Sequence, residues 1–389
     1  MQGFIIYVLF FSFISPCLCT RLNVGTTNDI YNVMQYGAIG DGKSDDTQAF
    51  SKAWSSACTS SGMSTLVIPS EKSFMVTRVN FSGPCNAKIL IQMEGRIVAP
   101  SKEDWKGAAN LISMEYLNGL IVDGNGHGEV YGNGATWWKC RTCFRPGVLF
   151  FHACNGLNVR NLKISDSPKT HVYVNQCDGA TFTRVSINSP ATSPNTDGFG
   201  ISYSTNILIQ DSDIKSGDDC IAVNDGSTFI NATRVTCGPG HGISVGSLGR
   251  NRTTEKVSDV HVRNCTFTGT ANGARIKTVE GGSGYAKQIS FEQIILVNVK
   301  NPIIIDQKYD PAIRDTSVLV SSVTYRGFTG TSATDVAIDL DCSSSGCYGI
   351  VLDENNIVSA QPGKKTSAFC RNAHGAATHT IPNVLCLSK

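Results

Sequence analysis

The chain has 389 residues, and its 33 Lys and Arg against 31 Asp and Glu give a formal net charge of +2. So small a charge excludes attraction to nucleic acid or to an anionic membrane by the protein as a whole, and leaves only local charge to bind an anionic partner. The length would allow two domains, but a repeat architecture can grow to this size around one core.

The N-terminal residues indicate export. Residues 4–19 are almost wholly apolar and end in small side chains before Thr20 and Arg21. A membrane span needs about 20 apolar residues, so this shorter run is typical of a signal peptide. We expect a leader at residues 1–19 and a single secreted, extracellular domain at residues 20–389. No later segment is apolar enough to span a bilayer, so we expect no membrane contact after the leader is removed.

The cysteines agree with export. Two of the 15 lie in the predicted leader, and the odd number that remains leaves at least one free thiol. Cys342 and Cys347 could close a small loop, and Cys220 and Cys237 could join neighbouring turns. Others are interpreted as small buried apolar side chains, among them Cys154, Cys177 and Cys265. Four N-glycosylation sequons suggest surface positions, at Asn80, Asn231, Asn251 and Asn264.

A helix is expected before the repeats begin. Residues 36–42 form a turn-rich opening, and Asp45 or Asp46 can then cap a helix that runs through Phe50 and Trp54 towards Cys58. A solenoid leaves its core open at each end, so this short N-terminal helix would cover one of them.

Short strands and turns fill the rest of the chain. A turn with Asn or Asp precedes alternating β-branched residues at 155–159, 178–182 and 205–209, and again near Val257 and Ala286. The spacing is roughly 23–29 residues, within the range of repeat folds. No helical pattern separates the strands, which disfavours βαβ units. We expect an all-β protein, a single-stranded right-handed parallel β-helix, rather than a β-sandwich, which also uses many short strands.

Four polar clusters lie in the middle of the repeats. They are Asn195-Thr196-Asp197, Gly217-Asp218-Asp219, Gly240-His241-Gly242 and Arg275-Ile276-Lys277. The first three are one repeat apart, and residues one coil apart stack at about 4.8 Å, so we expect them to form a column. Residues 246–258 are interpreted as a polar loop, which makes Arg275 the next rung. Alternation then places Arg275 and Lys277 on one outer side, with Ile276 in the core.

The composition of this column suggests glycosidic cleavage of an anionic polymer. That reaction uses one protonated and one ionised carboxyl group, and crowding three carboxylates raises the pKa of at least one. Gly217 permits the bend that would let Asp218 and Asp219 share a cleft; otherwise Asp219 would face the core and bond only to backbone amides. The glycines beside His241 favour a site residue over a structural one. Arg275 and Lys277 suit a sugar carboxylate.

Other candidates are weaker. Trp137 and Trp138 suit either a sugar platform or a loop anchor, and His171 is expected to be structural. Residues 124–128 are glycine-rich but follow no βαβ pattern, which argues against a phosphate loop. No Cys/His spacing indicates zinc, and no nucleophile-elbow motif indicates Ser/His/Asp catalysis. We expect no metal and no cofactor.

The four motifs, in this order, resemble those of the plant polygalacturonases, glycoside hydrolase family 28. The resemblance extends from about Tyr31 to the C-terminus and includes the longer segments 193–198, 216–222 and 237–244. It implies a pectin lyase-like β-helix that hydrolyses α-1,4 linkages between galacturonic acids of de-esterified pectin, with inversion and without a metal. We expect a monomer that cuts the polymer internally and acts in cell wall modification.

The resemblance also implies residue roles. The catalytic ones are Asp218 as general acid, Asp197 and Asp219 as the pair that activates water, and His241 as support for the acid. The substrate-binding ones are Arg275, Lys277, Tyr309 and Asn195. Many plant members continue after Arg-Ile-Lys with Thr-Trp-Gln-Gly-Gly, whereas this chain has Thr278-Val279-Glu280-Gly281-Gly282. The added carboxylate of Glu280 could weaken polygalacturonate binding or alter subsite preference.

Three alternatives stay open. An exo-acting polygalacturonase would cut from the chain end. A Ca²⁺-dependent pectate lyase would use an Arg base and release an unsaturated product. A non-catalytic pectin-binding wall protein would bind the polymer and release no reducing ends.

Overall fold

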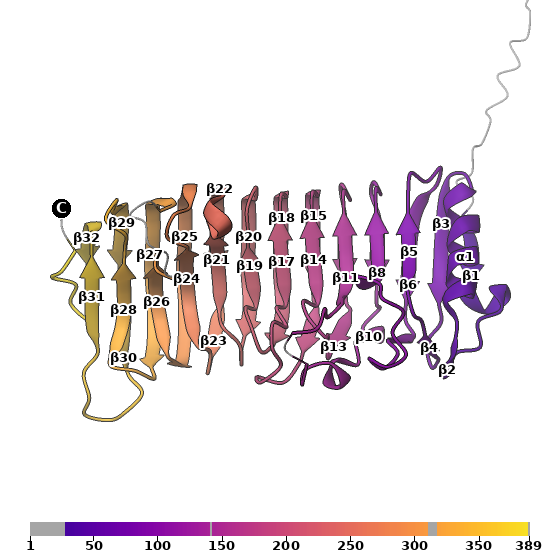
Figure 1. Cartoon of the computed structure of the whole chain (residues 1–389), viewed down its shortest axis with the longest axis horizontal. Helices are drawn as coiled ribbons and strands as arrows, with labels where there is room; N and C mark the ends of the chain where they lie inside the picture. The colour runs from indigo at the N-terminus through magenta and orange to yellow at the C-terminus, as the bar shows by residue number, and fades with distance from the viewer. Residues whose placement is uncertain (1–27, 141, 310–316, 388–389) are drawn as a thin grey trace, which may run out of the picture.

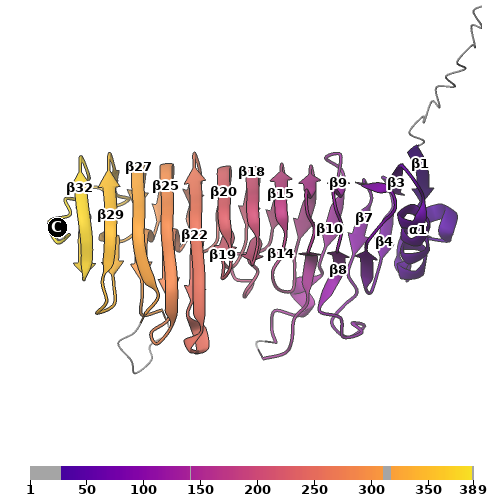
Figure 2. The same cartoon turned by 90° about the horizontal axis from the view of Figure 1, so that it is seen from above.

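The computed structural model describes residues 28–140, 142–309 and 317–387. Strands lie side by side along its whole length, from helix α1 at one end to the C-terminus at the other (Figures 1 and 2). They form one sheet of 21 strands and one of 11, and the paired strands run parallel. The predicted all-β parallel β-helix is confirmed. The predicted leader at residues 1–19 lies outside the described residues.

The chain alternates between the two sheets as it coils. The 21-stranded sheet contains β1 (Asn28–Asn32), β2 (Asp41–Asp45), β3 (Met63–Ile68), β4 (Ser73–Met75), β6 (Lys88–Met93), β7 (Arg96–Val98), β9 (Ile121–Asp123), β10 (Glu129–Tyr131), β12 (Asn158–Arg160), β13 (Lys163–Ser165), β15 (Asp178–Thr183), β16 (Ser186–Asn188), β18 (Thr205–Lys215), β20 (Thr228–Cys237), β22 (Thr254–Arg263), β23 (Thr266–Thr268), β25 (Ser283–Val299), β27 (Leu319–Ser332), β29 (Cys347–Asp353), β30 (Asn356–Ser359) and β32 (Ala373–Thr378). The 11-stranded sheet contains β5 (Val79–Ser82), β8 (Asn110–Glu115), β11 (Gly147–His152), β14 (Val172–Asn175), β17 (Phe199–Ser202), β19 (Ile221–Val223), β21 (Ile243–Leu248), β24 (Asn272–Thr278), β26 (Asn301–Asp306), β28 (Val336–Asp341) and β31 (Ser367–Arg371).

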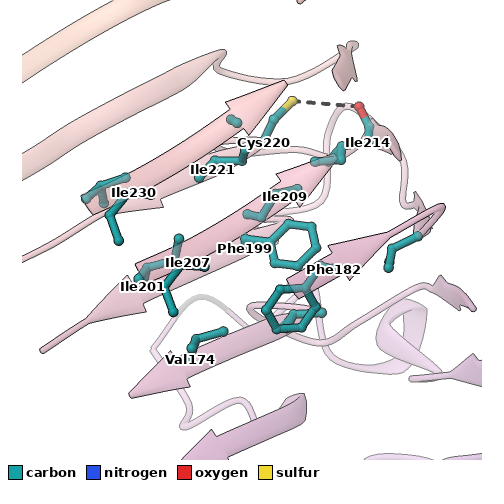
Figure 3. Close-up of a cluster of buried hydrophobic side chains, with 14 of the residues drawn as sticks. Val174, Phe182, Phe199, Ile201, Ile207, Ile209, Ile214, Cys220, Ile221 and Ile230 are labelled. Carbon is teal, nitrogen blue, oxygen red and sulfur yellow. Dashed lines mark hydrogen bonds between the residues drawn. The ribbon is translucent and has the colours of Figure 1, made fainter. Parts of the chain in front are cut away.

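Alternate residues of these strands point into one continuous core. Phe182, Phe199 and Ile209, from three different strands, are fully buried there (Figure 3). The rings of Phe182 and Phe199 meet edge to face with centroids 5.2 Å apart. Burying one such side chain stabilises the fold by about 1.5–3 kcal/mol. A slip of one residue would turn these side chains outward, so the buried ladder fixes the register of each coil and the position of each turn.

The predicted capping helix is present as α1 (Thr47–Thr59) and packs over the first coils with Phe50 and Trp54 buried. The two aspartates before it act differently. Asp45 accepts a hydrogen bond from the backbone N–H of Thr47, the first helical residue. Asp46 turns away and accepts from the N–H groups of the preceding turn, at Ile39 and Gly40. Three short 3₁₀ helices complete the helical elements of the described residues, η1 (Val33–Tyr36), η2 (Gly134–Thr136) and η3 (Arg250–Arg252).

The predicted loop at residues 246–258 is wrong over most of its length. Strand β21 continues to Leu248 and β22 begins at Thr254, so only a short turn containing η3 separates them. The first residues of β22, Thr254 to Ser258, pair with Ser283 to Lys287 of β25. The extra residues therefore lengthen a strand, because a neighbouring long strand satisfies their backbone hydrogen bonds. The prediction that Arg275 is the next rung is confirmed by its pairing with Ser244.

The cysteines and sequons lie largely where the sequence placed them. Cys220 pairs with Cys237 and Cys342 with Cys347, and three further disulfides join Cys58 to Cys85, Cys140 to Cys143 and Cys370 to Cys386. Free buried thiols are found at Cys154, Cys177 and Cys265. The four sequon asparagines are all exposed. Within the described part of the chain, the search for a helix long and apolar enough to cross a membrane finds none.

Candidate active site

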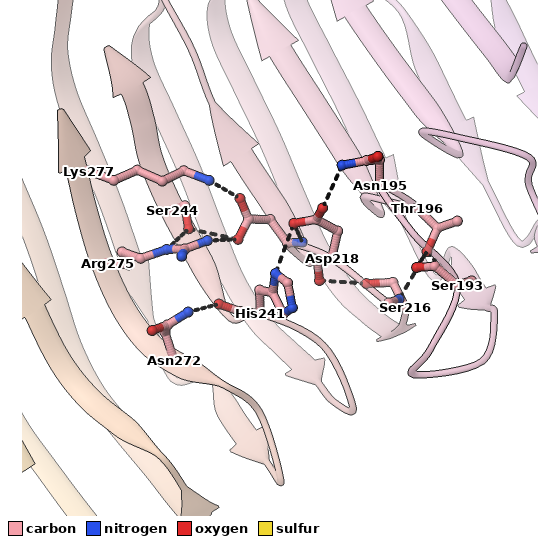
Figure 4. Close-up of polar contacts among 12 residues, drawn as sticks. Ser193, Asn195, Thr196, Ser216, Asp218, His241, Ser244, Asn272, Arg275 and Lys277 are labelled. Carbon is pink, nitrogen blue, oxygen red and sulfur yellow. Dashed lines mark hydrogen bonds and ion pairs between the residues drawn. The ribbon is translucent and has the colours of Figure 1, made fainter. Parts of the chain in front are cut away.

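Three of the polar clusters lie just before successive strands of the 11-stranded sheet, β17, β19 and β21, and the fourth lies within the next strand, β24 (Figure 4). Phe199, Ile221 and Ile243, the first residues of β17, β19 and β21, are register partners. Asp197, Asp219 and His241 each stand two residues before one of these partners. Because the buried strands fix the register, the turns before them stack, and residues far apart in sequence come together.

Asp218 lies at the solvent edge of the site. Its side chain is 19% exposed, and its Oδ1 lies 3.0 Å from Nδ1 of His241. Its Oδ2 accepts a hydrogen bond of 3.3 Å from Nδ2 of Asn195. Burial by itself would raise the pKa of Asp218, but the hydrogen bond and charge of His241, with the charge of Lys277, hold that pKa below its ordinary value. Asp218 and His241 therefore form a hydrogen-bonded pair within reach of solvent.

Asp219 is buried and bound to both predicted cations. Its Oδ1 lies 2.6 Å from Nη2 of Arg275, and its Oδ2 lies 2.7 Å from Nζ of Lys277. The Asp219 side chain is only 1% exposed, and Arg275 and Lys277 are 10% and 8% exposed. Asp219 bonds to charged side chains on the outer side of the sheet, so the alternative that it faces the core and bonds only to backbone amides is wrong.

A serine completes this ion-pair group. The hydroxyl of Ser244 donates to Asp219 Oδ1 over 2.8 Å and accepts from Nε of Arg275 over 2.9 Å. Ser244 is fully buried. A carboxylate that receives two cations and a hydroxyl is fixed in orientation by these charge-assisted contacts.

Asp197 has the opposite electrostatic character. Burial, together with the negative charges of Asp218 and Asp219, raises the pKa of Asp197 to about 8. Of the three carboxyl groups, Asp197 is therefore the one that holds a proton at neutral pH in the resting protein. The sequence prediction that crowding would keep one carboxyl protonated agrees with this direction, although Asp218 was the residue assigned as the acid.

The raised pKa of Asp197 makes stability depend on pH. In the unfolded chain this carboxyl would ionise near its ordinary pKa of 3.8, whereas in the folded protein it does so near 8. Folding is therefore favoured by the bound proton at low pH, and this contribution is lost as the pH rises from about 4 to about 8. We expect Asp197→Asn to be more stable than the wild type at pH 8, by on the order of 2 kcal/mol after solvent screening.

Urea unfolding of the wild type and Asp197→Asn at pH 4, 6 and 8 would test this. The difference in unfolding free energy should grow with pH between the first and last of these values. A difference that is constant with pH would show that Asp197 is ionised in the folded protein.

Two further residues border the site. Asn195 is held by the buried Arg145, whose Nη2 donates to Asn195 Oδ1 over 2.6 Å and whose Nη1 bonds to the carbonyls of Pro168 and Pro194. Tyr309 is 37% exposed, and its ring centroid lies 5.1 Å from Nζ of Lys277. The structure thus brings every predicted site residue into one region.

Glycines allow this close stacking. A Cβ atom on Gly217 would lie 1.9 Å from the carbonyl oxygen of Ser193, so Gly217 is needed for contact with the neighbouring coil rather than for a strand bend. Gly242 has a φ of +85°, and a Cβ there would lie 2.2 Å from the carbonyl oxygen of Asn272. The glycine after His241 is therefore required both by its conformation and by the backbone beside it.

Sequence reasoning missed three supporting residues. Ser244 was part of a quoted motif but was not singled out. Asn272 donates to the backbone carbonyl of His241 over 3.1 Å. Arg145 lies 50 residues before Asn195 and carries no motif. The sequence gives a signal for only one of these three residues, because Ser244 ends the segment 237–244 that contains His241.

The weaker candidates are structural. His171 is fully buried, its ring bonds to the carbonyl of Asp197 over 2.9 Å, and burial lowers its pKa to about 4. It therefore holds the backbone of a site residue as a neutral group. Trp137 is buried against Trp105, and the indole of Trp138 donates to the carbonyl of Ser167. These contacts favour the loop-anchor interpretation of the tryptophans.

The same residues were tested for a fit to a divalent cation. Asp218, Asp219 and His241 each place one ligand atom within 4.8 Å of the others. Both oxygens of Asp219, however, already receive Arg275 and Lys277. A cation would have to displace two resident positive charges or lie beside them, so this donor set fits a metal poorly.

The sequence profile of "Glycosyl hydrolases family 28" matches residues 58–381. The chain belongs to glycosyl hydrolase family 28. It is therefore a glycoside hydrolase, and the resemblance seen in the four motifs is confirmed. Among similar curated proteins, a probable polygalacturonase of Arabidopsis thaliana is 42% identical, and the alignment covers 94% of this chain and 82% of the relative. Polygalacturonase-2 of Solanum lycopersicum is 40% identical, and the alignment covers 91% of this chain and 80% of the relative.

Solved structures show the same fold. Endo-xylogalacturonan hydrolase from Aspergillus tubingensis superposes with a TM-score of 0.81 at 25% identity, over 90% of this chain and 98% of that chain. The exopolygalacturonase from Thermotoga maritima gives a TM-score of 0.77 at 19% identity, over 91% and 92%. These structures include enzymes named as endo-acting and exo-acting, so the fold leaves the mode of attack open.

Proposed function

We propose that this family 28 hydrolase is a polygalacturonase that cleaves α-1,4 linkages between galacturonic acids of de-esterified pectin. The observation that carries the proposal is the unequal environment of three adjacent carboxyl groups. Asp218 faces solvent beside His241, Asp219 is buried between two cations, and burial beside the other carboxyl groups raises the pKa of Asp197 to about 8. The relatives at about 40% identity are named polygalacturonases, which supports the choice of polymer.

In the proposed mechanism Asp218 protonates the leaving glycosidic oxygen. This oxygen can only accept a hydrogen bond, so its arrival beside Asp218 favours the protonated form of that carboxyl. The expulsion of water by the substrate further disfavours the charge-separated pair of Asp218 and His241. In this proposal a proton on the His241 ring passes to Asp218 as substrate binds, and His241 then supports the acid through its ring nitrogen.

The same event activates Asp197. Protonation of Asp218 removes one of the negative charges that raise the pKa of Asp197. Asp197 then ionises more readily and, with Asp219, can orient and deprotonate a water molecule. An acid and a base that act on opposite sides of the bond give inversion at the anomeric carbon. Because the linkage is α, the first product would be the β anomer, which NMR during early turnover would detect.

Substrate binding is assigned to Arg275, Lys277, Tyr309 and Asn195. The two cations are less available than the sequence suggested, because Asp219 engages both. The guanidinium of Arg275 has five N–H donors, and two of them donate to Ser244 and Asp219. A sugar carboxylate can therefore approach the remaining donors from the side of Tyr309, whose ring contacts both cations.

Endo attack and a wall role are also part of the proposal. Five disulfides and exposed sequons support export through an N-terminal leader at residues 1–19. We further propose that residues 20–389 are one catalytic domain that acts as a monomer in the cell wall. Brief digestion of polygalacturonate should release oligomers of mixed length. Release of monomer alone from the first minutes would contradict endo attack and favour an exo-acting enzyme.

The same digestion distinguishes hydrolysis from lyase chemistry and from binding alone. Hydrolysis should raise reducing ends without ultraviolet absorbance from an unsaturated product, and a chelator should leave the rate unchanged. An absorbing product or loss of activity with chelator would favour a Ca²⁺-dependent lyase. Binding without reducing ends would favour a non-catalytic wall protein.

A further inference from the structure

Aromatic side chains gather on the outer face of the 11-stranded sheet, on the N-terminal side of the carboxyl groups. Phe150 and His152 of β11 stack with ring centroids 5.8 Å apart, and Phe150 stacks on Tyr173 of β14 at 5.9 Å. The interplanar angles are 11° and 18°. All three side chains are partly exposed, so part of each ring is in contact with solvent. We call Phe150, His152 and Tyr173 the aromatic platform.

The platform is continuous with the active site. Phe150 pairs in register with Tyr173, and Tyr173 with Gly200. The same row continues through Ala222 to Ser244, the serine that bonds to Asp219. Strands β11, β14 and β17 are neighbours in Figure 1. Three strand spacings of about 4.8 Å separate Tyr173 from Ser244, so one extended polymer can reach both.

Small residues separate the platform from the carboxyl groups. Gly200 carries no side chain and Ala222 a single methyl group, and both are buried. A Cβ atom on Gly200 would lie 2.7 Å from Cδ2 of Tyr173, so the tyrosine ring leans over the glycine towards the active site. Its hydroxyl is fixed by Ser202 at 2.8 Å.

The platform lacks the cations that bind carboxylates. The row of Phe150 and Tyr173 includes Asn80 and Ser113, and the adjacent row contains Ser82, Glu115, His152, Asn175 and Ser202. No Lys or Arg stands in these described positions, and Glu115 is the register partner of His152. An anionic sugar gains nothing here, whereas aromatic faces bury the apolar face of any sugar ring.

We propose that the aromatic platform is a binding subsite for an uncharged sugar ring of the polymer, either a methyl-esterified galacturonosyl residue or a neutral sugar. The inference rests on the proposed pectin-degrading function and specifies the chemistry of the substrate on that side of the cleavage point. Carboxylate recognition belongs to Arg275 and Lys277, on the other side of the carboxyl groups. The enzyme therefore favours a chain with mixed charge along its length.

Binding of defined polymers would test the subsite. Affinity electrophoresis of the full chain would compare de-esterified polygalacturonate, highly methyl-esterified galacturonan and a galacturonan bearing neutral sugar branches. We expect Phe150→Ala combined with Tyr173→Ala to weaken binding to at least one of the uncharged polymers about 10-fold or more, and binding to polygalacturonate much less. Whether the esterified or the branched polymer responds identifies the source of the ring.

Two variants serve as controls. Tyr173→Phe keeps the ring and loses only the hydrogen bond to Ser202, so it should retain most of the binding. Tyr348→Ala removes an exposed aromatic that stacks on His374 at 4.8 Å on the other sheet, and it should bind like the wild type. Binding through the platform should also survive 0.5 M salt, which screens carboxylate recognition.

The outcomes separate the two proposals. Wild-type binding by the double variant, or an equal loss on all three polymers, would overturn the uncharged subsite. A wild-type protein that binds these polymers through the platform yet releases no reducing ends from any of them would overturn the proposed catalysis and leave the subsite standing.

Discussion

Asp218→Asn should lower kcat on polygalacturonate by roughly 10²–10⁴-fold, because a general acid contributes about that much to a rate. Asn has nearly the same shape and can still bond to Asn195 or His241, but it cannot supply a proton to the leaving oxygen. Substrate binding should therefore survive, and KM or a directly measured Kd should change little. Reducing-end kinetics together with affinity electrophoresis would measure both effects.

A matched control is available five residues earlier. Asp213 lies on β18 of the other sheet, where its side chain is 45% exposed and 3.8 Å from Lys215. Asp213→Asn makes the same chemical change away from the active site and should leave turnover at the wild-type level. Near-normal turnover by Asp218→Asn would remove Asp218 from the acid role and transfer it to Asp197, whose pKa is already raised.

Asp219→Ala should destabilise the protein by about 3–5 kcal/mol as well as inactivate it. The substitution leaves the cations of Arg275 and Lys277 buried without their carboxylate, and an uncompensated buried charge is far more costly than the net value of an ion pair. The Ser244 hydroxyl also loses its acceptor. Urea unfolding at neutral pH should show a lower midpoint with an unchanged slope.

The neighbouring sheet supplies a comparison for this effect as well. Asp211 forms a two-bonded pair with Arg234, at 2.6 and 3.0 Å, but on the exposed surface. Asp211→Ala should therefore cost much less, since water replaces the lost partner. Equal losses in the two variants would mean that the Asp219 group is open to water. Combining Asp219→Ala with Lys277→Met should restore part of the stability, because one buried charge is then removed.

The opposite behaviour of Asp197 and Asp219 reflects their places in one cluster. Asp219 is stabilised as an anion by buried cations, so its loss weakens the fold. Asp197 is destabilised as an anion by its neighbours, so its neutral replacement strengthens the fold above pH 4. Under the proposed mechanism, the stability lost at Asp197 would be the cost of its catalytic role, a trade-off common in active sites.

The fold and the grouping of the proposed site residues can both be predicted from the sequence. The strand repeat predicts a parallel β-helix, since alternating apolar residues at that period can be buried only by stacking coils. The spacing of Asp197, Asp219 and His241 matches one coil, so their alignment follows from the register of the buried strands. The motif order then identifies the family.

The ion pairs that these side chains form can be seen only in the three-dimensional structure. The sequence predicts that Arg275 and Lys277 bind a substrate carboxylate, whereas in the structure both bind Asp219. Arg145 reaches Asn195 from a coil 50 residues earlier. The stacking of Phe150 on Tyr173 likewise joins separate coils. Backbone register is set by a local, repeated pattern that can be read in the sequence. Ion pairing, burial and proton position depend on distances between coils, and the sequence does not contain those distances.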